Sequence, residues 1–328
     1  MKKILISFFI ALTCLLSGCS SRSSVPVVLF DTDMGNDIDD MLALQMLFNY
    51  HKAGMIDLEG ITISKCHPAA IEFVDAFCRY NGFEDMPLGY VYNGPNSDYE
   101  HYLKATLDAR YEGKPVMTPV RNIDSDIPQG HEKLLEMLNE QKDGSVLLIA
   151  VGPLTNISRL LQMEEGREAV KKKVRRLCIM SGDYREGANP EWNVLQDIEA
   201  SRVVYELCPV PLTSSGFEIG DCIRYPAESI EKDFGNPCSH PISVAYSNFQ
   251  QMPYCRQTWD LTSVLDAVEP DNGLFGHSEK GWIRVEPDGS TIFTADPAGL
   301  HEYITVTPEN AAKVRDLLVK RVVEVPAH

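Results

Sequence analysis

The sequence predicts an α/β fold with an open, mostly parallel central sheet flanked by helices, and with a late C-terminal β-hairpin. Three observations predict it. Apolar runs of strand length alternate with helical stretches along most of the chain. These runs are apolar at nearly every position, which is typical of parallel strands covered on both faces. Near the C-terminus, the pattern changes to alternating polar and apolar residues around a turn, which indicates two antiparallel strands.

The first strand and helix are the clearest pair. Residues 25–30 are apolar and rich in valine, with Pro26 only at the start, and predict a buried strand that ends at Asp31. Apolar residues then recur with helical spacing from Met41 to Tyr50. The alternation continues with strands over 58–64, 145–151, 174–181 and 210–214, and with helices over 69–80, 155–162 and a stretch between the last two strands.

The C-terminal part has a different pattern. Residues 282–294 alternate apolar and polar side chains around Asp288-Gly289, a typical hairpin turn. Residues 308–323 predict a final amphipathic helix. Because no repeat, low-complexity tract or linker interrupts the chain, we expect residues 27–328 to form a single domain.

The first residues are expected to be a targeting segment. Two lysines precede an apolar run that is too short to span a bilayer as a stable helix. The run ends in Leu-Ser-Gly-Cys at Cys19, which is typical of a bacterial lipobox; the alternatives are an uncleaved anchor or a plain secretory signal. We therefore expect residues 1–18 to be a lipoprotein signal peptide and Cys19 to be lipidated. Residues 19–26 would then tether the domain to the bacterial cell envelope, at the periplasmic or outer-membrane face.

Charge and cysteine content argue against a nucleic-acid partner and against a thiolate zinc site. The chain has 30 Lys+Arg against 47 Asp+Glu, a net charge of −17, and such a surface repels the phosphates of a nucleic-acid polymer. The nine cysteines include no C-x-x-C pair, so the sequence gives no support for a thiolate zinc site. Cys222 and Cys238 lie in a loop-like stretch and are the favoured disulfide pair.

Five aspartates lie between the first strand and the first helix. In open α/β sheets, ligands bind at this carboxyl end of a strand. Carboxylates so close repel one another, and a bound cation such as calcium, which takes six to eight oxygens, relieves the repulsion. A neighbouring carboxylate that does not bind the metal is suited to accept a proton from water. Helix capping explains one or two of these acids but not all five, which are Asp31, Asp33, Asp37, Asp39 and Asp40.

The stretch VLFDTDMGNDIDDMLAL resembles the N-terminal fingerprint of the inosine–uridine-preferring nucleoside hydrolase family, DxDxGxDDA. The resemblance implies that Asp33 and Asp40 bind calcium and that the aspartate before the last one is the general base. This sequence has two extra residues before the final pair, which leaves both Asp37 and Asp39 open as the base.

Two further segments extend the implied calcium site. IAVGPLTN at 149–156 resembles the family's GPLTN stretch, which implies that Val151 offers its backbone carbonyl to calcium. Trp259-Asp260 resembles the His-Asp or Trp-Asp pair that starts a late helix in the family, which implies that Asp260 completes the calcium shell. With a tryptophan at this position, the segment resembles the purine-preferring branch of the family, in which an aromatic ring stacks on the base. The tryptophan also removes the obvious acid for protonating the leaving base.

The segment NPEWN at 189–193 resembles the family's AEFN and implies contacts with the sugar. Glu191 and Asn193 would hydrogen-bond ribose hydroxyls, because a carboxylate accepts and an amide both donates and accepts. Asn189 would be a further sugar contact, and Trp192 a stacking surface. His67 stands where the family usually has a ribose-binding asparagine, and both a sugar contact and a surface histidine remain open.

The resemblance covers residues 27 to about 270 in colinear order. It implies calcium-dependent hydrolysis of the N-glycosidic bond of ribonucleosides to ribose and free base. Purine nucleosides are the first expectation for the substrate. A homodimer and a homotetramer are both consistent with it. One alternative is a phosphatase of the haloacid dehalogenase type, because Asp31-Thr32-Asp33 resembles its DxD motif. Another is a non-catalytic surface lipoprotein that binds a ribosylated ligand or a glycan.

Overall fold

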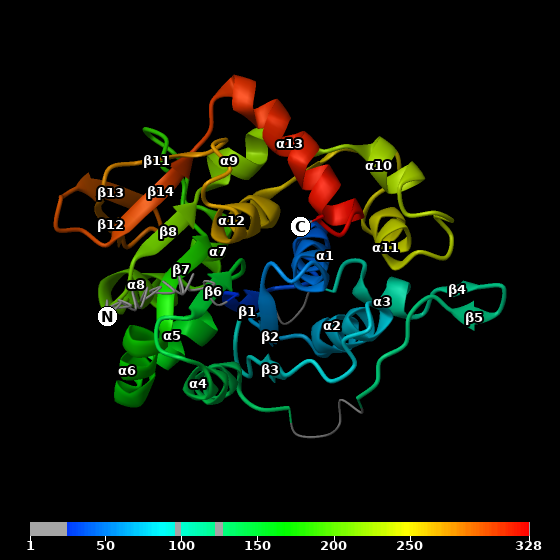
Figure 1. Ribbon diagram of the computed structural model, residues 1–328, viewed down its shortest axis with the longest axis horizontal. Helices are drawn as coiled ribbons and strands as arrows, with labels where there is room; N and C mark the ends of the chain where they lie inside the picture. The colour runs from blue at the N-terminus through cyan, green and yellow to red at the C-terminus, as the bar shows by residue number, and fades with distance from the viewer. Residues whose placement is uncertain (1–24, 96–99, 122–126, 328) are drawn as a thin grey trace, which may run out of the picture.

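The computed structural model describes residues 25–95, 100–121 and 127–327, and its centre is a ten-stranded sheet (Figure 1). Helices cover both faces of this sheet. In spatial order the strands are β13 (Thr291–Ala295), β12 (Gly281–Val285), β14 (His301–Thr305), β8 (Leu212–Ser215), β7 (Val174–Met180), β6 (Val146–Ala150), β1 (Val27–Thr32), β2 (Asp57–Ile63) and β3 (Leu88–Tyr90), with β11 (Gly276–His277) paired to β14.

The middle of the sheet is parallel. β1 pairs in parallel with β2 and β6, and the parallel arrangement continues through β7 and β8 to β14. All five residues of β6 are buried, as expected for a parallel strand covered on both faces. β12 and β13 form the antiparallel hairpin that the sequence predicts. The predicted fold class is confirmed.

Two apolar cores lie on the two faces of the sheet. Because side chains alternate along a strand, Val28 and Phe30 belong to one core and Leu29 to the other. The first core includes residues of α1 (Asp39–Lys52), α2 (Pro68–Tyr80), α11 (Pro241–Phe249), α12 (Trp259–Val268) and α13 (Pro308–Val323). The second includes residues of α4 (Gly130–Glu140), α5 (Thr155–Gln162), α6 (Glu164–Lys173) and α8 (Ile198–Leu207).

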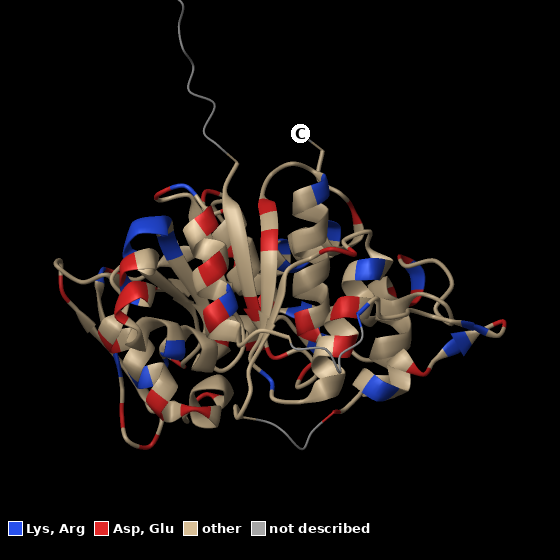
Figure 2. Cartoon of the chain, turned by 90° about the horizontal axis from the view of Figure 1, so that it is seen from below, with Lys and Arg blue, Asp and Glu red and all other residues tan. Residues whose placement is uncertain are grey.

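Short elements complete the described residues and build the loops at the sheet's edges. The helices are α3 (Leu103–Leu107), α7 (Trp192–Gln196), α9 (Phe217–Cys222) and α10 (Ala227–Lys232). The short strands are β4 (Arg110–Tyr111) with β5 (Lys114–Pro115), and β9 (Arg224–Tyr225) with β10 (Arg256–Gln257). Lys and Arg are interspersed with Asp and Glu along the described chain (Figure 2).

Some boundaries differ from the sequence expectation. β1 continues two residues past Phe30, because Asp31 and Thr32 still pair with β2. β14 has no strong strand signal, yet it pairs in parallel with β8 and so joins the hairpin to the main sheet. The expected Cys222–Cys238 disulfide is wrong: both cysteines are free and exposed, one at the end of α9 and the other in a turn capped by the Asn236 side chain.

Residues 1–24 lie outside the described residues, and with them the signal peptide, Cys19 and most of the tether. Within the described part of the chain, no helix combines the length and apolar character needed to cross a membrane.

Parallel pairing brings the carboxyl ends of β1, β6 and β7 to one edge of the sheet, the place where α/β proteins bind ligands. The chain leaves β1 into the loop of Asp33 and leaves β6 through Gly152. These two loops touch so closely that a Cβ on Gly152 would lie 2.5 Å from Ser64 Oγ and 2.7 Å from Asp33 Cβ. Only glycine allows this approach, which places Asp33 at the edge of the sheet.

Candidate active site

A pocket of about 290 Å³ opens at this edge of the sheet. The structure brings together nine of the residues that the sequence singles out, although they come from three separate parts of the chain. They are Asp33, Asp37, Asp39, Asp40, Glu191, Trp192, Asn193, Trp259 and Asp260.

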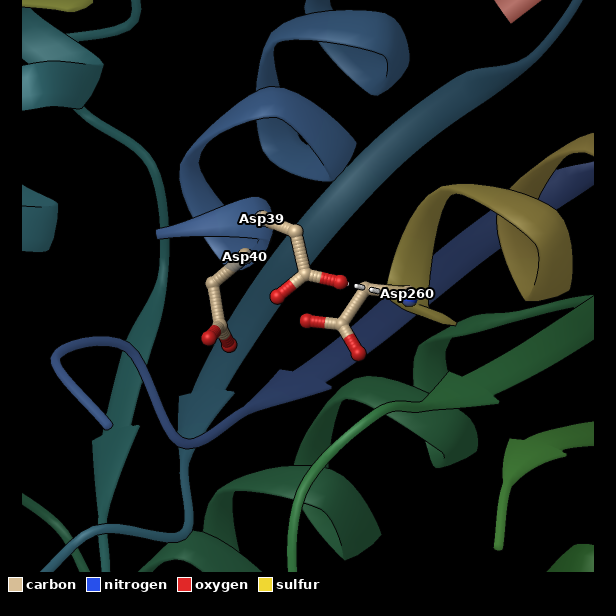
Figure 3. Close-up of side chains that lie close together, drawn as sticks. All are labelled: Asp39, Asp40 and Asp260. Carbon is tan, nitrogen blue, oxygen red and sulfur yellow. Dashed lines mark hydrogen bonds between the residues drawn. The ribbon is translucent and has the colours of Figure 1, made fainter. Parts of the chain in front are cut away.

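Three aspartates form a compact acidic cluster in the pocket. Asp39 and Asp40 lie in the first turn of α1, and Asp260 lies in the first turn of α12 (Figure 3). Each offers an oxygen, and these oxygens lie within 4.8 Å of one another. The three side chains point toward one another from two helices that are far apart in sequence.

Hydrogen bonds fix the cluster in place. The backbone N–H of Asp260 donates to Asp39 Oδ2 at 3.0 Å, which ties the start of α12 to the start of α1. Thr32 Oγ1, at the end of β1, donates to Asp40 Oδ1. Acidic side chains also suit these positions because the first turn of a helix carries partial positive charge.

The electrostatics of the cluster fit a hard cation. Asp39, Asp40 and Asp260 are at most 5% exposed. Burial raises the pKa of each carboxyl well above its usual value, and repulsion from neighbouring carboxylates raises it further. Buried oxygens that repel one another and lie this close form a donor set of the kind that divalent calcium or magnesium binds.

Asp33 faces the same pocket from the loop after β1. Its carboxylate accepts a hydrogen bond from Asn36 Nδ2 at 2.5 Å, and Asn36 in turn accepts one from Lys65 Nζ. Burial is the main cause that raises the pKa of Asp33 to about 6.

Asp31, two residues earlier, is not among the residues that line the pocket. It is fully buried and accepts hydrogen bonds from Thr62 Oγ1 at 2.5 Å and Asn156 Nδ2 at 2.8 Å. A DxD phosphatase needs its first aspartate as the exposed nucleophile, so this placement argues against the phosphatase alternative.

Asp37 has a different partner from the other acids. Arg256 Nε donates to Asp37 Oδ1 at 2.8 Å, and Arg256 Nη2 donates to Asp37 Oδ2. Asp37 Oδ1 also accepts the backbone N–H of Ile38 at 2.6 Å. Both of its oxygens are therefore occupied, whereas Asp39 lies in the acidic cluster.

Glu191 and Asn193 line the pocket at the start of α7. The Glu191 carboxylate accepts the backbone N–H groups of Gly182, Asn193 and Val194, at 3.2, 2.7 and 3.2 Å. Burial raises the pKa of Glu191 to about 7, although these hydrogen bonds lower it. The Asn193 amide donates to the carbonyl oxygen of Val151 at 2.8 Å, so the carbonyl expected to face a metal is hydrogen-bonded to a side chain of the pocket.

Two expected sugar contacts are not brought to the pocket. Asn189 is exposed in the loop before α7 and is not among the lining residues. His67 caps the start of α2, where its Nδ1 accepts the backbone N–H of Ala69 at 3.2 Å. His67 is thus a half-buried helix-capping residue outside the pocket lining, which matches neither the sugar contact nor the plain surface histidine left open by the sequence.

Aromatic rings form the remaining walls. Trp192, at the rim, is 53% exposed and has no ring partner among the described residues. Trp259 lies against Phe217, with 5.3 Å between the ring centroids, and its Nε1 donates to the Phe217 carbonyl at 2.9 Å. The pocket thus combines an acidic floor with apolar, planar surfaces.

Sequence reasoning missed six residues that line the pocket: Asn36, His101, Met180, Phe217, Phe249 and Arg256. Arg256 lies three residues before Trp259, so the Trp-Asp motif indicates that this segment is near the site. The motif does not indicate that the Arg256 side chain lines the pocket. His101 follows no motif. Its Nδ1 lies 3.1 Å from the Asn36 carbonyl, its ring meets Phe249 edge-on at 5.1 Å, and burial lowers its pKa.

Comparisons with known proteins agree with this geometry. Residues 28–323 match the family model described as inosine-uridine preferring nucleoside hydrolase. Uridine nucleosidase 1 of Arabidopsis thaliana is 25% identical over 282 residues, which cover 81% of this chain and 80% of that protein. The pyrimidine-specific ribonucleoside hydrolase RihB of Escherichia coli is 36% identical over 80 residues, about 24% of each chain.

Solved structures share the fold. An inosine-guanosine nucleoside hydrolase superposes with a TM-score of 0.71 at 18% identity, over 92% of this chain and 99% of that one. A purine-preferring ribonucleoside hydrolase from Gardnerella vaginalis gives 0.68 at 15% identity, over 92% and 100%. With a family match over nearly the whole chain, this fold and a buried acidic cluster suited to a metal, the protein is an N-ribosyl hydrolase and belongs to the inosine–uridine-preferring nucleoside hydrolase family.

Proposed function

We propose that this enzyme hydrolyses purine ribonucleosides to ribose and free base, and that it does so with a bound calcium ion. One observation carries the proposal: buried carboxylates and exposed aromatic surfaces line the same pocket. Cleavage of an N-glycosidic bond places positive charge on the sugar, which the carboxylates stabilise without rearrangement. The aromatic rings supply a surface for the base.

The metal would be held by Asp40 and Asp260 of the acidic cluster together with Asp33, which lines the same pocket and matches the family's first calcium ligand, whereas the third acid of the cluster, Asp39, would have another role. The oxygens of the three metal-binding acids are hard ligands, and calcium tolerates the mixed geometry that carboxylates from separate loops offer. When bound, the ion lowers the pKa of a coordinated water. The Val151 carbonyl, which Asn193 reaches, is the remaining ligand that the resemblance implies.

Asp39 would act as the general base. Its Oδ2 accepts the Asp260 N–H, whereas its Oδ1 accepts no hydrogen bond from the described residues and is not a buried unpaired atom, which leaves it open to a water. Asp37, the alternative left open by the sequence, has both oxygens engaged, by Arg256 and by the Ile38 N–H. This difference favours Asp39.

The preference for purines rests on the aromatic walls. Trp192 exposes a large apolar surface at the rim, and Trp259 contributes a second ring. Base–aromatic stacking contributes about 1–3 kcal/mol, and the larger purine ring system gains more contact than a pyrimidine. The named activities of the similar proteins include both uridine and purine nucleosides, so the pocket is the better guide.

The test is release of reducing sugar from a panel of purine and pyrimidine nucleosides, with and without a chelator. We expect purine nucleosides to react fastest, chelation to abolish turnover, and calcium to restore it. Asp33→Ala should lose turnover while its circular dichroism spectrum stays that of the wild type. Full activity in Asp33→Ala, or in the chelator, would contradict the metal assignment; faster pyrimidine turnover would contradict the base preference.

We also propose that the mature protein begins at a lipidated Cys19 and is anchored in the cell envelope. The sequence of residues 1–19 supports this. β1 begins at Val27 and reaches the pocket only after its last residue, so the tether would join the domain at the end of β1 that lies away from the pocket. Cys19→Ala should move the protein from the membrane fraction to the soluble fraction. Light scattering of the detergent-solubilised protein would distinguish a homodimer from a homotetramer.

A further inference from the structure

One ion pair in the pocket is not explained by metal binding or by sugar recognition. We propose that Arg256 stabilises the leaving base during bond cleavage, and that Asp37 is the positioning residue that holds Arg256 for this task. The inference rests on the family's N-glycosidic hydrolysis, but not on the identity of the metal or on the preference for purines.

The geometry of Arg256 is fixed from several sides. Asp37 takes Nε and Nη2 in a paired, two-point contact. The guanidinium carbon lies 5.1 Å from the ring centroid of Phe249 and 5.4 Å from that of Trp259. A guanidinium held by a carboxylate and by aromatic rings has little freedom to turn, which is the form of preorganisation that catalysis needs.

Arg256 nevertheless keeps donor capacity for a ligand. Its Nη1 has no hydrogen-bond partner among the described residues and is not one of the buried unpaired atoms, so it reaches solvent. Arg256 lines the pocket, and it is the sole lysine or arginine among the described lining residues. A ligand base that enters the pocket therefore meets one permanent cation with N–H groups to donate.

The charges of the pocket match the charges of the reaction. As the bond from C1′ to the base nitrogen breaks, its electron pair goes to the base, which gains negative charge, and the sugar gains positive charge. The water oxygen bonds to C1′, and its proton passes to the carboxylate base and then to solvent. The departing base takes a proton from solvent, while Arg256 keeps its own protons and stabilises the negative charge by hydrogen bonding.

Asp37 lies where this sequence departs from the family pattern. It falls in the stretch that holds two extra residues before the final aspartate pair. The same chain has a tryptophan, and not a histidine, before Asp260, so it lacks a titratable proton donor at that position. The Asp37–Arg256 pair supplies a cation to the same wall, since Arg256 lies over the Trp259 ring.

The experiment compares two kinds of leaving group in wild type and Arg256→Gln. A purine or pyrimidine base is a poor leaving group, whereas the nitrophenolate of p-nitrophenyl β-D-ribofuranoside leaves without help. We expect Arg256→Gln to lower kcat on nucleosides about 10²-fold or more, as loss of one preorganised donor does, and to change kcat on the nitrophenyl riboside less than about 3-fold. Arg256→Lys should show the same selectivity, because lysine cannot reproduce the two-point contact.

Retained activity on the nitrophenyl riboside also shows that the variant folds and keeps its metal and sugar sites. Equal losses on both substrates would overturn the proposal, because they would indicate a structural or sugar-binding role. Unchanged activity on both would overturn it as well. If the purine preference or the calcium assignment fails, the kcat losses on nucleoside and on nitrophenyl riboside are compared with the nucleoside and metal that do support turnover. A failure of the Arg256 proposal is therefore distinguishable from a failure of the proposed function.

Asp37 is tested as a positioning residue. Asp37→Asn should reduce turnover of nucleosides more than turnover of the nitrophenyl riboside, and the double variant with Arg256→Gln should be no worse than Arg256→Gln alone. Additive losses in the double variant would contradict the positioning role. Arg185→Gln is the matched control: Arg185 also lies over an aromatic ring, Phe217 at 5.4 Å, and pairs with Asp183, but it is not among the lining residues. It should leave the ratio unchanged.

Discussion

Residues of one type take different roles in this site because their partners differ. Asp31 is held by Thr62 and Asn156 in the core, Asp37 is paired with Arg256, and Asp39 joins the acidic cluster. The sequence predicts the group of aspartates, because all five lie within ten residues. It cannot divide their roles, because the deciding partners lie from 31 to 221 residues away along the chain.

The acidic cluster trades stability for function. Asp40→Asn keeps an oxygen to accept the Thr32 hydroxyl but removes one buried negative charge. In a chelator, we expect the free energy of unfolding of the variant to exceed that of the wild type by about 1 kcal/mol, because like charges repel. Activity should fall at least about 10²-fold, because the metal loses a ligand.

The sign of the pH effect follows from the pKa. Burial raises the pKa of Asp40, so the wild type loses stability as the pH rises and this carboxyl ionises. The amount by which the unfolding free energy of Asp40→Asn exceeds that of the wild type should therefore grow with pH. Urea unfolding at pH 6 and pH 8 measures it. A variant less stable than the wild type at both pH values would contradict this account.

At the scale of elements, the starts of three helices surround the pocket. α1 and α12 supply the acidic cluster, and α7 supplies Glu191 and its neighbours. The sequence predicts α1 from its apolar spacing and the start of α12 from the WD motif. It missed β14, whose five residues lack a continuous apolar run and which is defined by its pairing with β8.

His301 links β14 to the hairpin. Its Nδ1 accepts the backbone N–H of Ile283 at 2.9 Å, and burial lowers its pKa to about 4. The unfolded chain therefore binds a proton that the folded one rejects, so stability is complete above about pH 6.5 and is lost as pH falls towards 4, by up to about 3 kcal/mol.

His301→Asn keeps an acceptor for the Ile283 N–H but does not titrate. The free energies of unfolding of wild type and variant are compared from pH 7 to pH 4.5. As the pH falls, the wild type should lose stability relative to the variant. Carboxylates titrate in both proteins and cancel in the difference. A constant difference across this range would show that His301 does not control the acid stability of the hairpin.

At the scale of the whole molecule, the parallel core could be predicted well and the pocket walls could not. Runs of apolar residues predict strands β1, β2, β6 and β7, and the aspartates of the site follow β1 directly in the sequence. His101, Phe217, Phe249 and Arg256 come from loops and short helices that only the folded chain brings together. No local sequence pattern marks these residues, because what they share is their position in the folded pocket and not a regular spacing along the chain.

Binding of a divalent ion should stabilise the whole fold, since α1 and α12 are more than 200 residues apart in the chain. At a concentration about 100 times the Kd, an ion that binds only the folded state adds about 2.7 kcal/mol. We expect calcium to raise the Tm of the wild type measured by calorimetry after chelation. Asp260→Asn should show little of this rise, and an equal rise in both would place the ion elsewhere.

The placement of the tryptophans makes the enzyme its own optical reporter. The chain has three: Trp192 at the rim, Trp259 in the wall, and Trp282 in the hairpin, where its indole N–H faces Asp296. A nucleoside stacking in the pocket would quench emission from the first two and leave the third unaltered. In Trp282→Phe all of the tryptophan fluorescence, excited selectively over that of the tyrosines, would come from the pocket, so occupancy could be followed during turnover without labelling the protein.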